Sequence, residues 1–110
     1  MRFYLRPVLL ASLLLAACSE PLTKTETLAE ACFMDQMGTR KMCNCMASAA
    51  NQRLDPEVFD MFVTMGTHAP DDDSEEMREA RETAASMTPA QQQQMQAFMA
   101  AAIDLCGLRM

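Results

Sequence analysis

Residues 32–46 read CFMDQMGTRKMCNCM, a stretch with three cysteines and a single glycine near its centre. Gly38 suits the left-handed position that commonly ends a helix, so we expect a first helix over 26–37, capped at its start by Thr25. Apolar residues recur at helical spacing after Gly38, which predicts a second helix over 40–54. The stretch is therefore typical of a helical hairpin that turns at Gly38.

Three more helices are predicted downstream of this hairpin. An Asp-Pro pair starts the third, over about 56–65, and Gly66 ends it. The fourth begins at Ser74 and has few large apolar residues, so we expect it at the surface. The last, over about 89–106, opens with the capping-box sequence TPAQ. Its predicted apolar face consists of Met95, Phe98, Met99, Ala102, Ile103 and Cys106.

Composition favours a small all-α fold. Apolar residues make up 50% of the chain, but Ala and Met dominate, with no Trp, one Tyr and five Phe. Three glycines and few β-branched residues argue against a sheet. The glutamine run 91–94 is interpreted as the exposed face of the last helix. The sequence predicts one domain over 26–110, a disulfide-stapled bundle of four to five short helices.

The N-terminus has the features of a cleaved export signal over residues 1–17. Two arginines precede an apolar stretch of about ten residues, shorter than the roughly 20 that span a bilayer. The stretch ends in Leu15-Ala16-Ala17-Cys18, which resembles the lipobox of prokaryotic membrane lipoproteins. That resemblance implies cleavage before Cys18 and diacylation of its thiol.

The residue after the lipobox cysteine is Ser19 and not aspartate. In lipoproteins of two-membrane bacteria this implies transfer to the outer membrane, so the resemblance implies an outer-membrane anchor and a domain facing the periplasm. A short polar tether over 18–25 is expected between the lipid and the first helix.

Four cysteines remain once Cys18 carries lipid: Cys32, Cys43, Cys45 and Cys106. An exported domain meets an oxidising compartment, where pairing is expected. A bridge between Cys43 and Cys45 is unfavourable, because side chains two apart in a helix point about 200° apart. Two connectivities stay open, 32–43 with 45–106 and 32–45 with 43–106. In both, the second helix is joined to the first and to the last.

The mature chain resembles small cysteine-containing helical lipoproteins of bacterial envelopes, through the spacing C-x10-C-x-C and a cysteine that ends the last helix. This resemblance implies no activity. The chain has one histidine and no recognisable catalytic triad or phosphate loop, so we expect no enzyme. Without the two leader arginines, seven Lys and Arg face 15 Asp and Glu, which disfavours nucleic-acid binding. We therefore predict a non-catalytic structural or partner-binding module of the envelope, with covalent lipid and no other cofactor.

Methionine suggests one alternative function. Met34, Met37, Met42 and Met46 crowd the predicted turn between the first two helices. Soft thioether ligands suit Cu(I), so these four could form a copper site. The same residues are also what an Ala/Met core uses to fill gaps, or what a protein offers as an adaptable surface to a partner.

Overall fold

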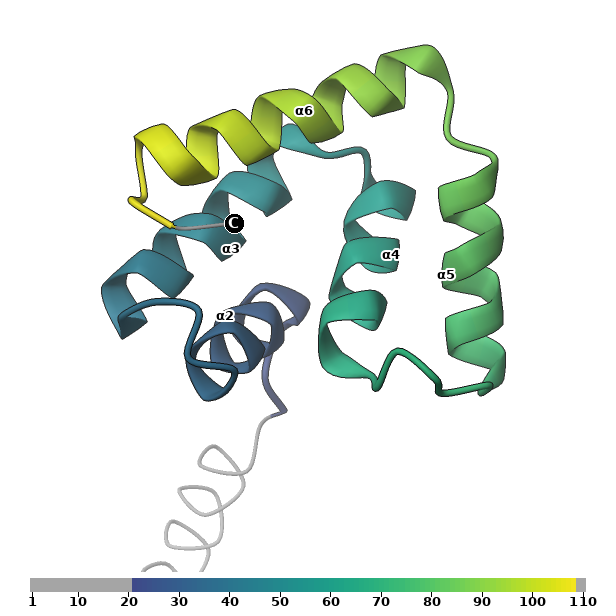
Figure 1. Cartoon of the computed structure of the whole chain (residues 1–110), viewed down its shortest axis with the longest axis horizontal. Helices are drawn as coiled ribbons and strands as arrows, with labels where there is room; N and C mark the ends of the chain where they lie inside the picture. The colour runs from purple at the N-terminus through teal and green to yellow at the C-terminus, as the bar shows by residue number, and fades with distance from the viewer. Residues whose placement is uncertain (1–20, 109–110) are drawn as a thin grey trace, which may run out of the picture.

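The computed structural model describes residues 21–108, which form five helices (Figure 1). These are α2 (Lys24–Met34), α3 (Arg40–Arg53), α4 (Pro56–Thr67), α5 (Glu75–Ala85) and α6 (Pro89–Asp104). The predicted all-α, disulfide-bonded class is confirmed. Within the described range, each helix is too short or too polar to cross a bilayer.

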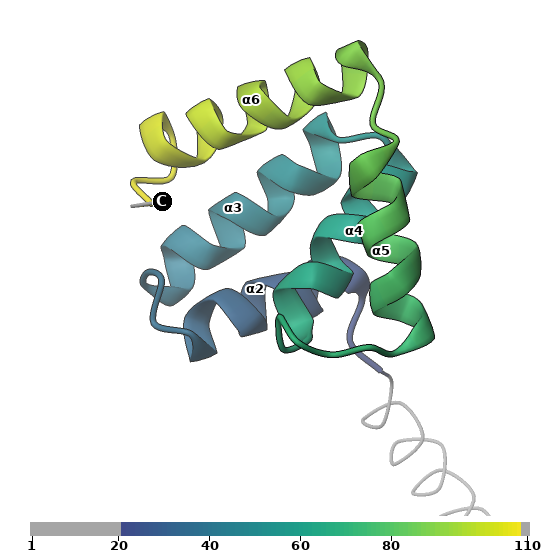
Figure 2. The ribbon, with the colours of Figure 1, turned by 45° about the vertical axis from the view of Figure 1, so that its right-hand side comes forward.

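The helices are arranged as two pairs joined by α2. The α3 and α6 helices pack along each other, and so do α4 and α5, while α2 contacts both α3 and α4 (Figures 1 and 2). Direct contact between α3 and α4 is sparse. The short α2 therefore carries much of the packing that holds the two pairs together.

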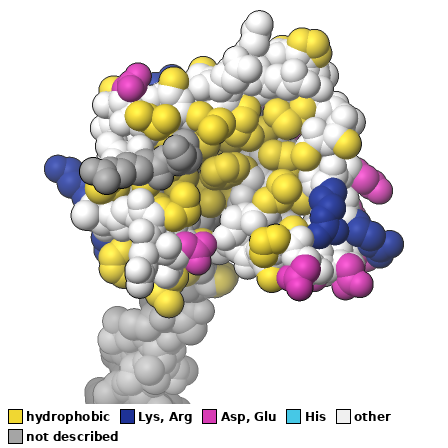
Figure 3. Space-filling view, in the orientation of Figure 1, with side chains coloured by type: hydrophobic (Ala, Val, Ile, Leu, Met, Phe, Trp, Pro, Cys, Tyr) yellow, Lys and Arg dark blue, Asp and Glu magenta, His cyan; other side chains and the backbone are white. Residues whose placement is uncertain are grey.

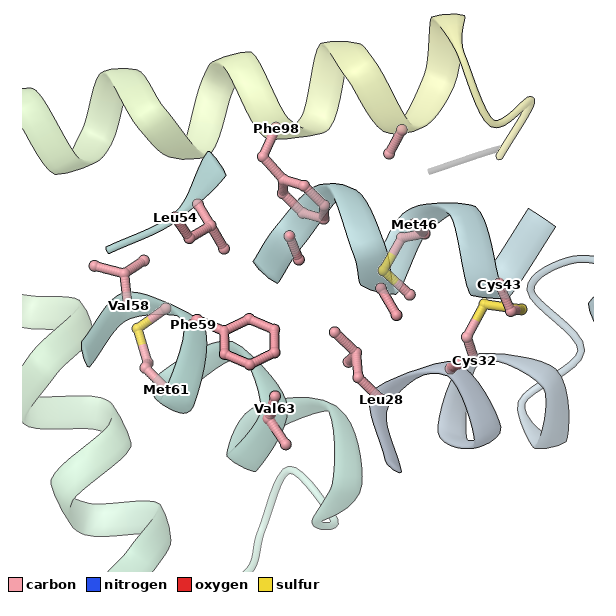
Figure 4. Packing of buried hydrophobic residues seen from close by; sticks show 14 of the residues in the cluster. Leu28, Cys32, Cys43, Met46, Leu54, Val58, Phe59, Met61, Val63 and Phe98 are labelled. Atoms are coloured by element: carbon pink, nitrogen blue, oxygen red, sulfur yellow. A yellow bond between two sulfur atoms is a disulfide. The ribbon is translucent and has the colours of Figure 1, made fainter. Parts of the chain in front are cut away.

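The core lies where α2, α3, α4 and α6 meet. Phe98 of α6 is fully buried and points toward α3 (Figure 4), and its ring meets the edge of Phe62 from α4 at a centroid distance of 5.1 Å. Small side chains of α3, such as Ala47 and Ala50, are also fully buried and let the neighbouring helices approach closely. This core matches the predicted Ala/Met composition, with phenylalanines as its largest members.

The first helix differs from its predicted range of 26–37. Thr23, not Thr25, caps α2 by accepting a hydrogen bond from the N–H of Glu26 at 3.1 Å, and the helix ends at Met34. Gly38 was wrongly expected to supply the left-handed residue; Gln36 does so, with a φ of 58°. Gly38 serves close approach instead, because a β-carbon there would lie 3.1 Å from Leu108 Cδ2.

The predicted stop at Gly66 is also wrong, since α4 continues to Thr67. A β-carbon at Gly66 would lie 3.3 Å from Leu28 Cδ1, so glycine here brings α4 close to α2. The fourth helix lies at the surface, as predicted, with eight of its eleven residues exposed. Met77 and Ala80 are buried, and α5 packs them against α4 while its other faces remain exposed.

The last helix has the predicted capping box, with Thr88 and Gln91 exchanging side-chain and backbone hydrogen bonds. Its predicted apolar face is correct for Phe98, Ala102 and Cys106, and wrong for Met99 and Ile103, which are 43% and 46% exposed. Because α6 contacts mainly α3, only a narrow stripe of its surface is covered.

The glutamine run is not wholly exposed as predicted. Gln91 is buried and Gln94 is half-buried. The Gln94 side chain accepts from the N–H of Asp55 at 3.0 Å and donates to its carboxylate at 3.1 Å, while Gln91 donates to Asp55 and to Glu57. Asp55 makes no side-chain cap bond to its own helix, so its carboxylate serves to fasten the α3–α4 corner to α6.

Candidate functional site

The structure pairs Cys32 with Cys43 and Cys45 with Cys106, with Cα–Cα distances of 5.6 and 5.5 Å. This selects one of the two connectivities that the sequence left open. The first bridge is buried and staples α2 to α3 (Figure 4). The second joins Cys45 of α3 to Cys106, which lies two residues after the end of α6. As predicted, Cys43 and Cys45 face different neighbours.

The second bridge also positions the C-terminal residues of the described chain. Two residues after Cys106, Leu108 is 2% exposed, and its N–H donates to the carbonyl of Ala102 at 3.1 Å. Gly107 between them has a φ of 73° and donates to the carbonyl of Ile103, as in the αL type of helix C-cap. The turn folds Leu108 back beneath α6, toward Gly38 and α2.

An apolar pocket of about 250 Å³ opens between α2, α3, α4 and Leu108. Hydrophobic side chains gather on the face of the molecule shown in Figure 3, in the middle between the α2–α3 side and the α4 side. The pocket is lined by Leu28, Ala31, Cys32, Asp35, Met37, Met46, Phe62, Met65, Gly66 and Leu108. We refer to it as the methionine pocket, because three of its ten lining residues are methionines.

The pocket exists because α3 and α4 make little direct contact. Leu28 and Met46 form its buried floor, since both are nearly inaccessible to solvent. Met37 and Met65 are 43% and 42% exposed, and therefore lie at the mouth. Asp35, also exposed, is the single charged residue in the lining.

The structure does not bring all four predicted copper ligands to this pocket. Met37 and Met46 line it, but Met34 is 69% exposed and is not part of the lining. The Met42 side chain lies beside Gly38 and Gly107. Its Cε would be 3.6 Å from a β-carbon at Gly38 and 3.7 Å from one at Gly107. A copper site formed by these four residues stays a prediction.

Sequence reasoning missed seven of the ten lining residues as members of one site. Asp35, Met65 and Leu108, among others, were given no role. Met65 lies three residues after Phe62 on the same helical face, a spacing visible in the sequence. Leu108 reaches the pocket only through the turn after Cys106, which no local pattern marks beyond Gly107.

A second, polar cleft lies between α4 and α5. Its acidic residues are Glu57, Asp60, Glu76 and Glu79, and Lys24 forms an ion pair with Asp60 at 2.8 Å. Within residues 21–108, no group of three or more His, Cys, Asp and Glu side chains is placed to hold a metal ion. His68 is half-buried, and its Nδ1 lies 2.9 Å from the carbonyl of Thr64.

The predicted lipidation residue, Cys18, and the signal over 1–17 lie outside the described residues. Comparisons with protein-family models, with curated proteins and with solved structures find no match to this chain.

Proposed function

We propose that the protein is a lipid-anchored, non-catalytic module of the bacterial envelope that binds a protein partner through the methionine pocket. The anchor is assigned to Cys18 on the lipobox sequence, with the outer membrane as its site and the domain facing the periplasm. Two disulfides are in keeping with an oxidising compartment.

The observation that carries the binding role is the open mouth of the pocket. Burying Met37 and Met65 under a partner would remove apolar surface from water, at about 25 cal/mol for each Å² covered. A few apolar anchors in a pocket supply most of the free energy at many protein interfaces. Unbranched thioether side chains adapt to the shape of an incoming residue, which suits a binding surface.

The partner-binding role is tested by photo-crosslinking in living cells. A photoreactive amino acid at Met65 is expected to give a discrete protein adduct, because this side chain lies at the pocket mouth. The matched control carries the same group at Glu82, on the exposed surface of α5. Adding Met37→Glu should abolish the Met65 adduct by placing a charge at the mouth. Equal adducts from both positions, or none from Met65, would refute the role.

The anchor is tested by replacing the predicted lipidation residue. Cys18→Ala should move the protein from the membrane fraction to the soluble fraction or leave it unprocessed, because one site carries all the acyl chains that hold it. Fractionation and intact mass measure both outcomes. A Cys18→Ala protein that stays in the membrane fraction with the wild-type mass would contradict the lipobox assignment.

A further inference from the structure

We infer that the occupant of the methionine pocket is a cationic amphipathic helix of the partner, with apolar side chains in the pocket and a Lys or Arg beside Asp35. This inference rests on the proposed partner-binding role and adds the chemistry of the partner.

The net negative charge of the domain favours a cationic partner. Residues 21–108 contain 14 Asp and Glu but only six Lys and Arg, a net charge of −8. Two of the six cations are already in ion pairs, Lys24 with Asp60 and Arg40 with Glu30, both at 2.8 Å. A surface of this sign attracts cationic partners and accelerates their association.

Asp35 is placed to pair with a cationic side chain of the partner. It is the one charged residue that lines the pocket, and it takes part in neither of the two ion pairs found within residues 21–108. A cationic group on a docked helix would meet this carboxylate at the edge of the apolar mouth. The pocket therefore combines apolar contact with one carboxylate that can pair with a positive charge.

The architecture favours a helical partner. Extended peptides commonly dock by adding a strand to an exposed sheet edge, and residues 21–108 contain no strand. A helix satisfies its own backbone hydrogen bonds and can present apolar side chains to a groove at i, i+3 and i+4. With about 250 Å³, the pocket suits a few anchor side chains better than a whole small molecule, for which about 300–1,000 Å³ is usual.

The same charge disfavours two other occupants. A second copy of this chain would bring two domains of net charge −8 together, and like charges across an interface weaken binding. An anionic lipid surface would repel the domain for the same reason. The cationic helix is the occupant whose charge and apolar face both complement the pocket.

The test uses the native protein in phosphatidylcholine vesicles and a matched pair of synthetic helical peptides of about 15 residues. Both peptides carry the same apolar face of leucines and one tryptophan; the other positions are Lys and Gln in one peptide and Glu and Gln in the other. The protein contains no Trp, so the emission of the peptide reports its own burial.

We expect the basic peptide to bind at least about tenfold more tightly than the acidic one at low salt, with the difference shrinking as salt rises. Met37→Gln should weaken the basic peptide about fivefold or more, whereas Met34→Gln, outside the pocket, should not. Asp35→Asn should weaken it about two- to fivefold, with Asp104→Asn as the exposed control.

Three results would overturn the inference: tighter binding of the acidic peptide, equal effects of Met34→Gln and Met37→Gln, or a signal no larger than that of protein-free vesicles. The first leaves the partner-binding role intact if Met65 crosslinks in cells, because only the charge of the partner is then wrong. A Met65 adduct that proves to be a second copy of this chain would also overturn the cationic-helix assignment.

Discussion

The double variant Cys45→Ala/Cys106→Ala is expected to lose about 4 kcal/mol of unfolding free energy. The bridge spans a sequence separation of 61, and the entropy of the unfolded chain that a bridge removes grows with the length of the closed loop. For a domain of this size the loss corresponds to a fall in melting temperature of about 15–30 °C, measurable by circular dichroism.

Matched controls replace the exposed neighbours of each cysteine, Asn44→Ala and Leu105→Ala, and should change stability by less than about 0.5 kcal/mol. The double variant should also lose peptide binding at temperatures where it is still folded, because Leu108 forms part of the methionine pocket and is held by the turn after Cys106. A double variant that melts within a few degrees of the wild type would show that packing alone holds α6.

The second large effect is expected from Phe98→Ala, at about 3–5 kcal/mol. The Phe98 side chain is 0% exposed and makes an edge-to-face contact with Phe62, so truncation leaves a cavity and removes an aromatic pair. Denaturant unfolding measures the loss. Met99→Ala, one residue along and 43% exposed, is the control and should cost less than about 1 kcal/mol.

Similar unfolding free energies for Phe98→Ala and Met99→Ala would mean that α6 does not pack through the face described here. Limited proteolysis gives an independent readout. The Phe98→Ala protein should be cut within α6, because α6 packs mainly on α3. The α4 and α5 helices should stay protected, because they pack on each other.

Some features that depend on short segments of sequence were predicted correctly, although the helix ends expected at Thr25, Gly38 and Gly66 were wrong. The capping box at Thr88 and the proline at the start of α4 each depend on neighbouring residues, and the structure contains both. The all-α class followed from periodicity and composition in the same way. Such features depend on interactions between residues close in sequence, so they do not require knowledge of how the helices pack.

Features that depend on how helices pack were not predictable. Disulfide connectivity required the handedness of the bundle, which no spacing of cysteines encodes. Met99 and Ile103 have helical periodicity but no neighbour to cover them, because α6 contacts mainly α3. The methionine pocket arises because α3 and α4 make little direct contact, and its lining comes from four separate segments of the chain. Such an arrangement depends on tertiary packing and not on local sequence.

The two bridges also differ in when they can form. In a chain that enters an oxidising compartment N-terminus first, Cys32, Cys43 and Cys45 arrive well before Cys106. Loop closure costs nearly the same for a 32–43 or a 32–45 pair, so chain entropy hardly discriminates between them. Packing of α2 on the Cys43 side of α3 must select the native pair, and Cys45 must wait as a free thiol for its partner. Early oxidation to 32–45 would trap the chain until thiol–disulfide exchange released it. In such a compartment, fast pairing of the first two helices would shorten oxidative maturation by avoiding this detour.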